Sequence, residues 1–141
     1  MKKLFSLPIS IGLLLALSLA GCEDEKKSDE LIIGKWNVDS GKWTDYENGV
    51  KTDEGTMDFA PGEVTIEFIK GGTGKLTEDS EVSTFTWEIV GDLLIIDLAY
   101  DDPMDMDYSV TETELNLKFS YEETSGGIVY REDTELYCTR D

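Results

Sequence analysis

Few residue types in this chain are suited to acid–base or metal chemistry. Among 141 residues there are 31 acids and no histidine, so the commonest general base and the commonest metal ligand are both missing. Asp101, Asp102, Asp105 and Asp107 lie close enough together to offer oxygen ligands to calcium. The turn glycine and bidentate glutamate of an EF-hand loop are absent at the required spacing. We therefore predict a solvated loop there, no metal site, no cofactor and a protein that is not an enzyme.

The glycine-rich segment from Lys70 to Lys75 has the composition of a phosphate-binding loop but not its spacing. Ile69 stands five positions before Gly74, and Leu76 occupies the place where a serine or threonine would bind magnesium. The segment is predicted to be a glycine hairpin between two strands.

Cys22 is the residue with the most specific predicted chemistry. It follows Lys2, Lys3 and an uncharged, leucine-rich stretch that runs to Ala20. That stretch has the length of a secretion signal and is short for a membrane-spanning helix, which needs about 20 apolar residues. A buried N-terminal helix with an incidental cysteine is the alternative, but charge, apolar length and cysteine position all agree with a signal.

The four residues Leu19, Ala20, Gly21 and Cys22 closely resemble the lipobox of bacterial lipoproteins. In that class a peptidase cleaves before the cysteine, whose thiol carries a diacylglycerol. The resemblance implies a signal peptide over residues 1–21 and a lipidated Cys22. The protein's partner is then a membrane, to which the buried acyl chains anchor it.

Residues 22–30 are predicted to be the acylated cysteine and a flexible acidic tether. Residues 23–30 are all polar, so this segment has no apolar area to bury. The run Glu23-Asp24-Glu25 also resembles the acidic export signal of Bacteroidota lipoproteins. That resemblance implies an outer-membrane protein exposed at the cell surface, although an ordinary solvated linker has the same composition.

The whole composition fits one acidic globular domain. The chain is long enough for one core, and its formal charge of −19 repels phosphate backbones, which argues against nucleic-acid binding. Two cysteines allow at most one disulfide, and an acylated Cys22 leaves Cys138 unpaired. We expect Cys138 to be a buried, reduced thiol.

From Leu31 onward, apolar residues alternate with polar ones at a period of two, which predicts short strands. Asn48-Gly49 and Gly91-Asp92 are typical of tight hairpins. About eight strands joined by short turns predict an all-β protein, an antiparallel meander closed as a small barrel; a two-sheet sandwich satisfies the same alternation. The apolar alternating positions are Val64, Ile66, Phe68, Phe85, Trp87, Ile89, Leu115, Leu117, Phe119, Tyr121, Leu136 and Cys138.

The first predicted strand contains Gly34 and Trp36, and its Gly-x-Trp sequence resembles the opening of lipocalins and of short lipocalin-like domains in Bacteroidota lipoproteins. In that family an arginine near the end of the last strand packs over the tryptophan ring, and Arg140 holds the matching position. The resemblance implies a lipocalin-like barrel over residues 31–141, with Gly34, Trp36 and Arg140 at its floor. A core tryptophan with an exposed terminal arginine is the alternative.

Two functions fit this prediction. The first is binding of a small apolar ligand within the barrel. The second is a non-catalytic interaction or structural role toward another envelope protein, with a barrel filled by its own side chains. The stretch from Gly41 to Gly55 is a candidate contact loop, although a strand hairpin around Asn48-Gly49 is the stronger prediction. The candidate ligand-binding residues are Ile66, Phe68, Phe85, Trp87, Phe119 and Tyr121.

Overall fold

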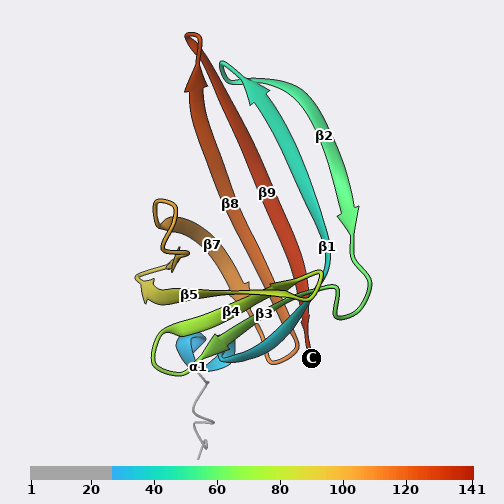
Figure 1. Ribbon diagram of the computed structural model, residues 1–141, viewed down its shortest axis with the longest axis vertical. Helices are drawn as coiled ribbons and strands as arrows, with labels where there is room; N and C mark the ends of the chain where they lie inside the picture. The colour runs from blue at the N-terminus through green and yellow to red at the C-terminus, as the bar shows by residue number, and fades with distance from the viewer. Residues whose placement is uncertain (1–26) are drawn as a thin grey trace, which may run out of the picture.

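The computed structural model describes residues 27–141, so the signal peptide, Cys22 and most of the tether lie outside the described residues. The described chain forms one short helix and nine strands in a single antiparallel sheet (Figure 1). The elements are α1 (Ser28–Ile32), β1 (Gly34–Glu47), β2 (Val50–Asp58), β3 (Val64–Ile69), β4 (Thr73–Glu78), β5 (Glu81–Val90), β6 (Leu93–Asp97), β7 (Met104–Val110), β8 (Glu114–Ser125) and β9 (Ile128–Arg140).

Eight of the strands close into a barrel. Strands β3 to β9 pair in sequence order, and β1 joins β3 on one side and β9 on the other. This closure confirms the predicted small antiparallel barrel of the lipocalin-like type and excludes the two-sheet sandwich. Closure leaves no unpaired edge in this part of the sheet.

The ninth strand, β2, lies outside the closed barrel. Residues 34–37 of β1 pair with β3, whereas residues 40–47 pair with β2 on the same side. The change follows a register shift between Val38 and Ser40, where Asp39 is the extra residue. A β-bulge of this kind bends its strand and increases the local twist, which lets one long strand leave the barrel.

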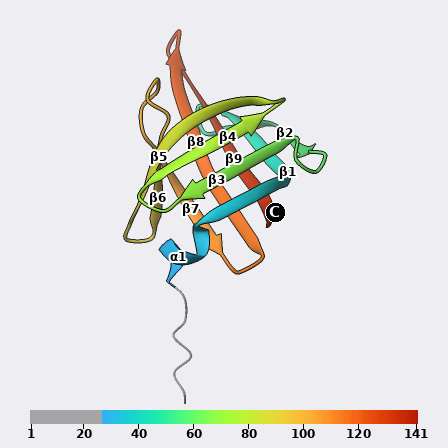
Figure 2. The same ribbon diagram turned by 60° about the horizontal axis from the view of Figure 1, so that its bottom comes forward.

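Strands β1, β2, β8 and β9 therefore extend beyond the barrel as a four-stranded sheet, which we call the projecting sheet. It comprises residues 40–47, 50–58, 118–125 and 128–137, in the order β2-β1-β9-β8. Figures 1 and 2 show its hairpin tips at the end of the molecule opposite α1.

The β1–β2 tip has the predicted hairpin geometry. Asn48 and Gly49 both have positive φ angles, 49° and 80°, as a type I′ turn requires. The Asn48 amide donates to the Val129 carbonyl (2.8 Å), and the Val129 amide donates to Asn48 Oδ1 (3.1 Å). The turn is thereby joined to β9, so residues 41–55 form a strand hairpin rather than a contact loop.

Apolar side chains fill the barrel. The Phe68 ring meets the rings of Phe85 and Trp87 edge-on, with centroids 5.6 Å and 5.5 Å apart. Phe85 in turn lies so close to Gly74 that a Cβ there would overlap its ring. The buried core comprises Ile32, Trp36, Val38, Ile66, Phe68, Phe85, Leu94, Ile96, Met106, Leu115, Leu117 and Cys138.

Two predicted segments differ in the structure. The first strand begins at Gly34 rather than Leu31, because residues 28–32 form α1 and bury Ile32 completely. The tether prediction through Glu30 is therefore too long by the first turn of this helix. Asp105 and Asp107 belong to strand β7, so only residues 101–103 of the acidic segment form a loop.

Candidate functional site

Trp36 and Arg140 lie together at the α1 end of the barrel. They are directly opposed in the β1–β9 register, and the Arg140 guanidinium carbon lies 4.2 Å from the centroid of the Trp36 ring. Trp36 is fully buried, and its indole N–H donates to the Ile32 carbonyl at 2.8 Å. The structure thus brings together the two residues expected at the barrel floor.

Arg140 also joins three segments of the chain. Its Nη2 donates to the Leu31 carbonyl (2.6 Å), its Nη1 to Ile33 (3.0 Å) and its Nε to Glu112 (2.6 Å). Carbonyls at a helix end lack partners within the helix, and a cation satisfies them well. Gly34 makes room for this arrangement, because a Cβ there would lie 2.5 Å from Nη1 and its φ of 133° disfavours other residues. These contacts close the α1 end of the barrel, so we assign Gly34, Trp36 and Arg140 a structural role.

An ion pair continues this closure on the surface. Lys35 Nζ lies 2.8 Å from Asp141 Oδ2. Its hydrogen bond to Asp141 raises the pKa of Lys35, and the same hydrogen bond lowers the pKa of Asp141. Both charges are thereby favoured at neutral pH.

The six candidate ligand-binding residues have different surroundings in the structure. Ile66, Phe68 and Phe85 belong to the core. Trp87 is half-buried, and its indole N–H is bound by the Thr73 carbonyl at 2.8 Å. Phe119 and Tyr121 lie on β8, where Tyr121 is 62% exposed on the projecting sheet.

The outer face of the projecting sheet carries paired charges. Lys118 Nζ lies 3.0 Å from Glu135 Oε1, and Arg131 Nε lies 3.0 Å from Asp133 Oδ1. Burial opposes ionisation of Glu135, but hydrogen bonds from Lys118 and Tyr137 outweigh it and lower the pKa of Glu135. The bond to Glu135 raises the pKa of Lys118.

Two aromatic rings complete this outer face. The Arg131 guanidinium carbon lies 4.2 Å from the centroid of Tyr46, and Lys42 Nζ lies 5.5 Å from that of Tyr137. Such cation–π contacts hold each cation against its own sheet. The basic residues of this face already have partners within the protein.

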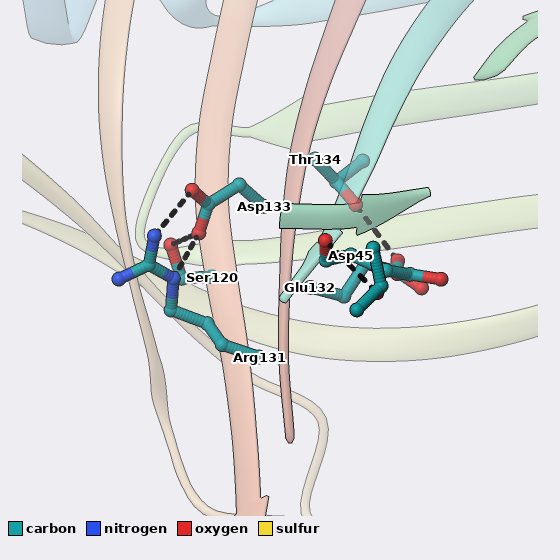
Figure 3. Close-up of polar contacts among 7 residues, drawn as sticks. Asp45, Ser120, Arg131, Glu132, Asp133 and Thr134 are labelled. Atoms are coloured by element: carbon teal, nitrogen blue, oxygen red, sulfur yellow. Dashed lines mark hydrogen bonds and ion pairs between the residues drawn. The ribbon is translucent and has the colours of Figure 1, made fainter. Parts of the chain in front are cut away.

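The inner face of the projecting sheet continues the barrel interior and has a different composition. Trp43 lies across the backbone of Gly55, where a Cβ would meet the indole at 2.6 Å. Farther toward the tips, Asp45 is opposed by Asp53 on one side and by Glu132 on the other. Figure 3 shows Asp45, Glu132 and Thr134 grouped apart from Ser120, Arg131 and Asp133 across β9.

An open depression of about 320 Å³ lies over this end of the sheet. Tyr121 on β8 and Tyr130 on β9 are diagonal neighbours, because Tyr121 pairs with Glu132 and Tyr130 pairs with Glu123. The residues that line the depression are Asp45, Tyr46, Glu47, Thr52, Tyr121, Glu123, Tyr130, Arg131 and Glu132. Arg131 lines it with a guanidinium that is bound to Asp133 and lies over Tyr46.

Sequence reasoning missed this inner face as a candidate site. A usable signal is present, because aromatic and acidic residues share the same parity along three strands. On β1 these are Trp43, Asp45 and Glu47; on β8, Tyr121 and Glu123; on β9, Tyr130 and Glu132.

Chemically reactive groups are sparse in the described part of the chain. Cys138 is a buried free thiol, and burial raises its pKa to about 12, with a further contribution from Asp39. Residues 27–141 contain no group of three or more side chains arranged to hold a metal. Within the same range, no helix has both the length and the apolar character needed to cross a membrane.

The fold is that of a small lipocalin-like barrel with one additional strand. Comparison of the chain with protein-family models, with curated proteins and with solved structures finds no match.

Proposed function

We propose that this protein is a lipid-anchored, non-catalytic interaction protein of the bacterial envelope. In this proposal residues 1–21 are removed, Cys22 is acylated, and the barrel is displayed at the surface of the outer membrane. The lipobox-like sequence around Cys22 supports the anchor, and the acidic residues after it support surface display.

The observation that carries the proposed role is the filled barrel. Three of the residues expected to contact an apolar ligand are core side chains that pack against one another. Phe85, Phe119 and Tyr121 border three different depressions, each open to solvent. Interiors packed in this way leave no room for a ligand without displacing side chains. The geometry therefore favours an interaction role over apolar-ligand binding. Binding of an apolar ligand stays an untested prediction.

The placement of the elements agrees with an anchored protein. Cys22 precedes α1 by only six residues, a reach of about 20 Å when extended. An anchor there would hold the α1 end toward the membrane, and the projecting sheet lies at the opposite end (Figures 1 and 2). The sheet would then point away from the lipid surface.

The anchor is tested by growth on labelled palmitate in a bacterial host that processes lipoproteins. We expect Cys22→Ala to abolish label incorporation and to leave the membrane fraction. Cys138→Ala serves as the matched control and should keep both label and fractionation. Palmitate incorporation into the Cys22→Ala protein would contradict the proposed anchor.

The filled barrel is tested by mass spectrometry of the protein purified from its own host. The native spectrum and the denatured spectrum should give the same mass, because covalent lipid survives denaturation and no other molecule is bound. A constant extra mass that is lost on denaturation would instead support the apolar-ligand function.

A further inference from the structure

Charge is segregated between the two faces of the projecting sheet. The sheet contains four basic residues, Lys42, Lys51, Lys118 and Arg131, and all of them lie on the outer face. Each has a partner there: Tyr137, Glu54, Glu135 and Asp133, respectively. The inner face of the described sheet has carboxylates but no basic residue. Its acids are Asp45, Glu47, Asp53, Glu123 and Glu132.

These inner carboxylates are placed where they repel one another. Asp45 is the direct cross-strand neighbour of both Asp53 and Glu132. Like charges directly opposite one another destabilise a sheet, whereas opposite charges stabilise it. The outer face of the same strands has the stabilising arrangement, with Glu135 between Lys42 and Lys118. The inner face is thus complementary to an external positive charge.

Aromatic rings provide a second, independent feature of this face. Tyr121 is 62% exposed beside Glu132, and Tyr130 is half-buried between Glu47 and Glu123. An exposed tyrosine ring next to carboxylates attracts an ammonium or guanidinium group through both its quadrupole and the neighbouring charge. The outer face already shows the same chemistry, since Arg131 lies over Tyr46.

From this complementarity we propose that the inner face of the projecting sheet docks a basic segment of a partner protein, with lysine or arginine side chains seated among Tyr121, Tyr130 and the inner carboxylates. The proposal names the partner class for the interaction role proposed above and rests on it. A second copy of this chain would present the same acidic face, and an anionic lipid surface or a nucleic acid would be repelled as well.

The width of the face favours a polypeptide over a single small cation. The inner carboxylates occur on all four strands, from Asp53 on β2 to Glu123 on β8. Four strands about 4.8 Å apart span roughly 14 Å, so one small cation reaches only part of this charge. Several cationic side chains on one extended segment reach all of it.

The test uses the full-length protein in mild detergent and a nine-residue peptide of alternating lysine and threonine. A peptide of alternating glutamate and threonine is the control ligand. We expect saturable binding of the basic peptide, weakened by added salt, and no binding of the acidic one. Failure of the basic peptide to bind would overturn the docking proposal and leave the anchor and filled-barrel tests unaffected.

Matched variants separate the inner face from general negative charge. The inner variant combines Glu123→Gln with Glu132→Gln, and the outer variant combines Glu122→Gln with Glu54→Gln; each removes two exposed carboxylates from the same sheet. We expect the inner variant to weaken peptide binding at least tenfold and the outer variant to change it less than twofold. Equal weakening by both would show nonspecific attraction and overturn the proposal.

The aromatic contribution has its own variant. Tyr121→Ala removes an exposed ring without removing charge, so the fold should tolerate it. We expect it to weaken binding of the basic peptide about fivefold. If the wild-type protein binds calcium alone and no peptide, the face is a weak cation site and the proposed partner is wrong.

Discussion

At the scale of single residues, Arg140 acts through both its charge and its shape. Its guanidinium covers Trp36 and donates to the backbone carbonyls of Leu31, Ile33 and Glu112. Lysine in its place would keep the charge but lose the planar set of donors. The stability of the floor therefore depends on the pair rather than on either residue alone.

We predict a coupling between Trp36 and Arg140 in a double-mutant cycle. Trp36→Ala should lower the free energy of unfolding by about 3–5 kcal/mol, because it opens a large cavity in the core. Arg140→Ala should cost about 1–3 kcal/mol through the lost ring contact and hydrogen bonds. Since both changes remove the same contact, the double variant should cost less than the sum, by about 0.5–2 kcal/mol.

Urea unfolding of the wild type, the two single variants and the double variant measures this coupling. Arg131→Ala is a control, since Arg131 is a paired cation on the projecting sheet and lies away from the floor. Its effect should add to that of Trp36→Ala. Strict additivity of the Trp36 and Arg140 changes would contradict the closure described above.

Cys138 provides a second prediction at the residue scale. Burial raises the pKa of its thiol to about 12, so almost none is the reactive thiolate at pH 8. In the Cys22→Ala chain, where it is the sole cysteine, Cys138 should react with iodoacetamide at least a hundredfold more slowly in the folded state than in urea. The measurement is labelling followed by mass; rapid labelling of folded protein would show an accessible thiol.

At the scale of elements, the barrel and the projecting sheet differ in what they bury. Strand β3 has three of its six residues buried, whereas β2 has none, and β8 is exposed from Ser120 onward. Strands with few buried apolar contacts open locally at a lower free energy than the core. The projecting sheet should therefore be the less protected part of the described chain.

Hydrogen exchange tests this difference. We expect amides of β2 and of residues 120–125 to exchange at least tenfold faster than those of β3 and residues 114–118. The tenfold ratio corresponds to about 1.4 kcal/mol in the free energy of opening. Uniform protection across β2, β8 and β3 would show that the projecting sheet opens only together with the barrel.

The elements also show what the sequence was able to predict. Strand alternation and turn residues such as Asn48 and Gly49 predict the hairpins, because they act locally. The family resemblance predicts the Trp36–Arg140 pair. The departure of β2 from the barrel has no local signal, because its residues are polar at nearly every position and fit either edge. The end of helix α1 likewise depends on a distant residue, because Arg140 donates to the Leu31 carbonyl, while the nearby Trp36 donates to that of Ile32.

The inner acidic face illustrates the same limit. In the sequence of a single strand, each of its carboxylates alternates with an outer residue and looks like an ordinary solvated position. Only the register places Asp45 beside both Asp53 and Glu132. Pairing across strands is a property of the closed sheet, so a single strand does not reveal it.

At the scale of the whole molecule, negative charge dominates. The chain carries 31 acids against 12 basic residues. The ion pairs Lys35–Asp141 and Lys118–Glu135 lie at the surface, where such pairs contribute little and are screened by salt. Repulsion among the remaining carboxylates acts over longer distances and is also screened. The net effect of salt on stability measures which of the two is larger.

We predict that salt stabilises the folded protein. Self-repulsion grows with net charge and favours the expanded chain, so screening it should favour the compact state. Raising sodium chloride from 10 mM to 300 mM at pH 7 should raise the free energy of unfolding by about 1–2 kcal/mol, measured as a higher urea midpoint with an unchanged slope. Choline chloride at the same ionic strength should act equally, since screening does not depend on the cation. A larger effect of sodium alone would indicate a bound cation, and a lower midpoint in both salts would show that the surface ion pairs outweigh the repulsion.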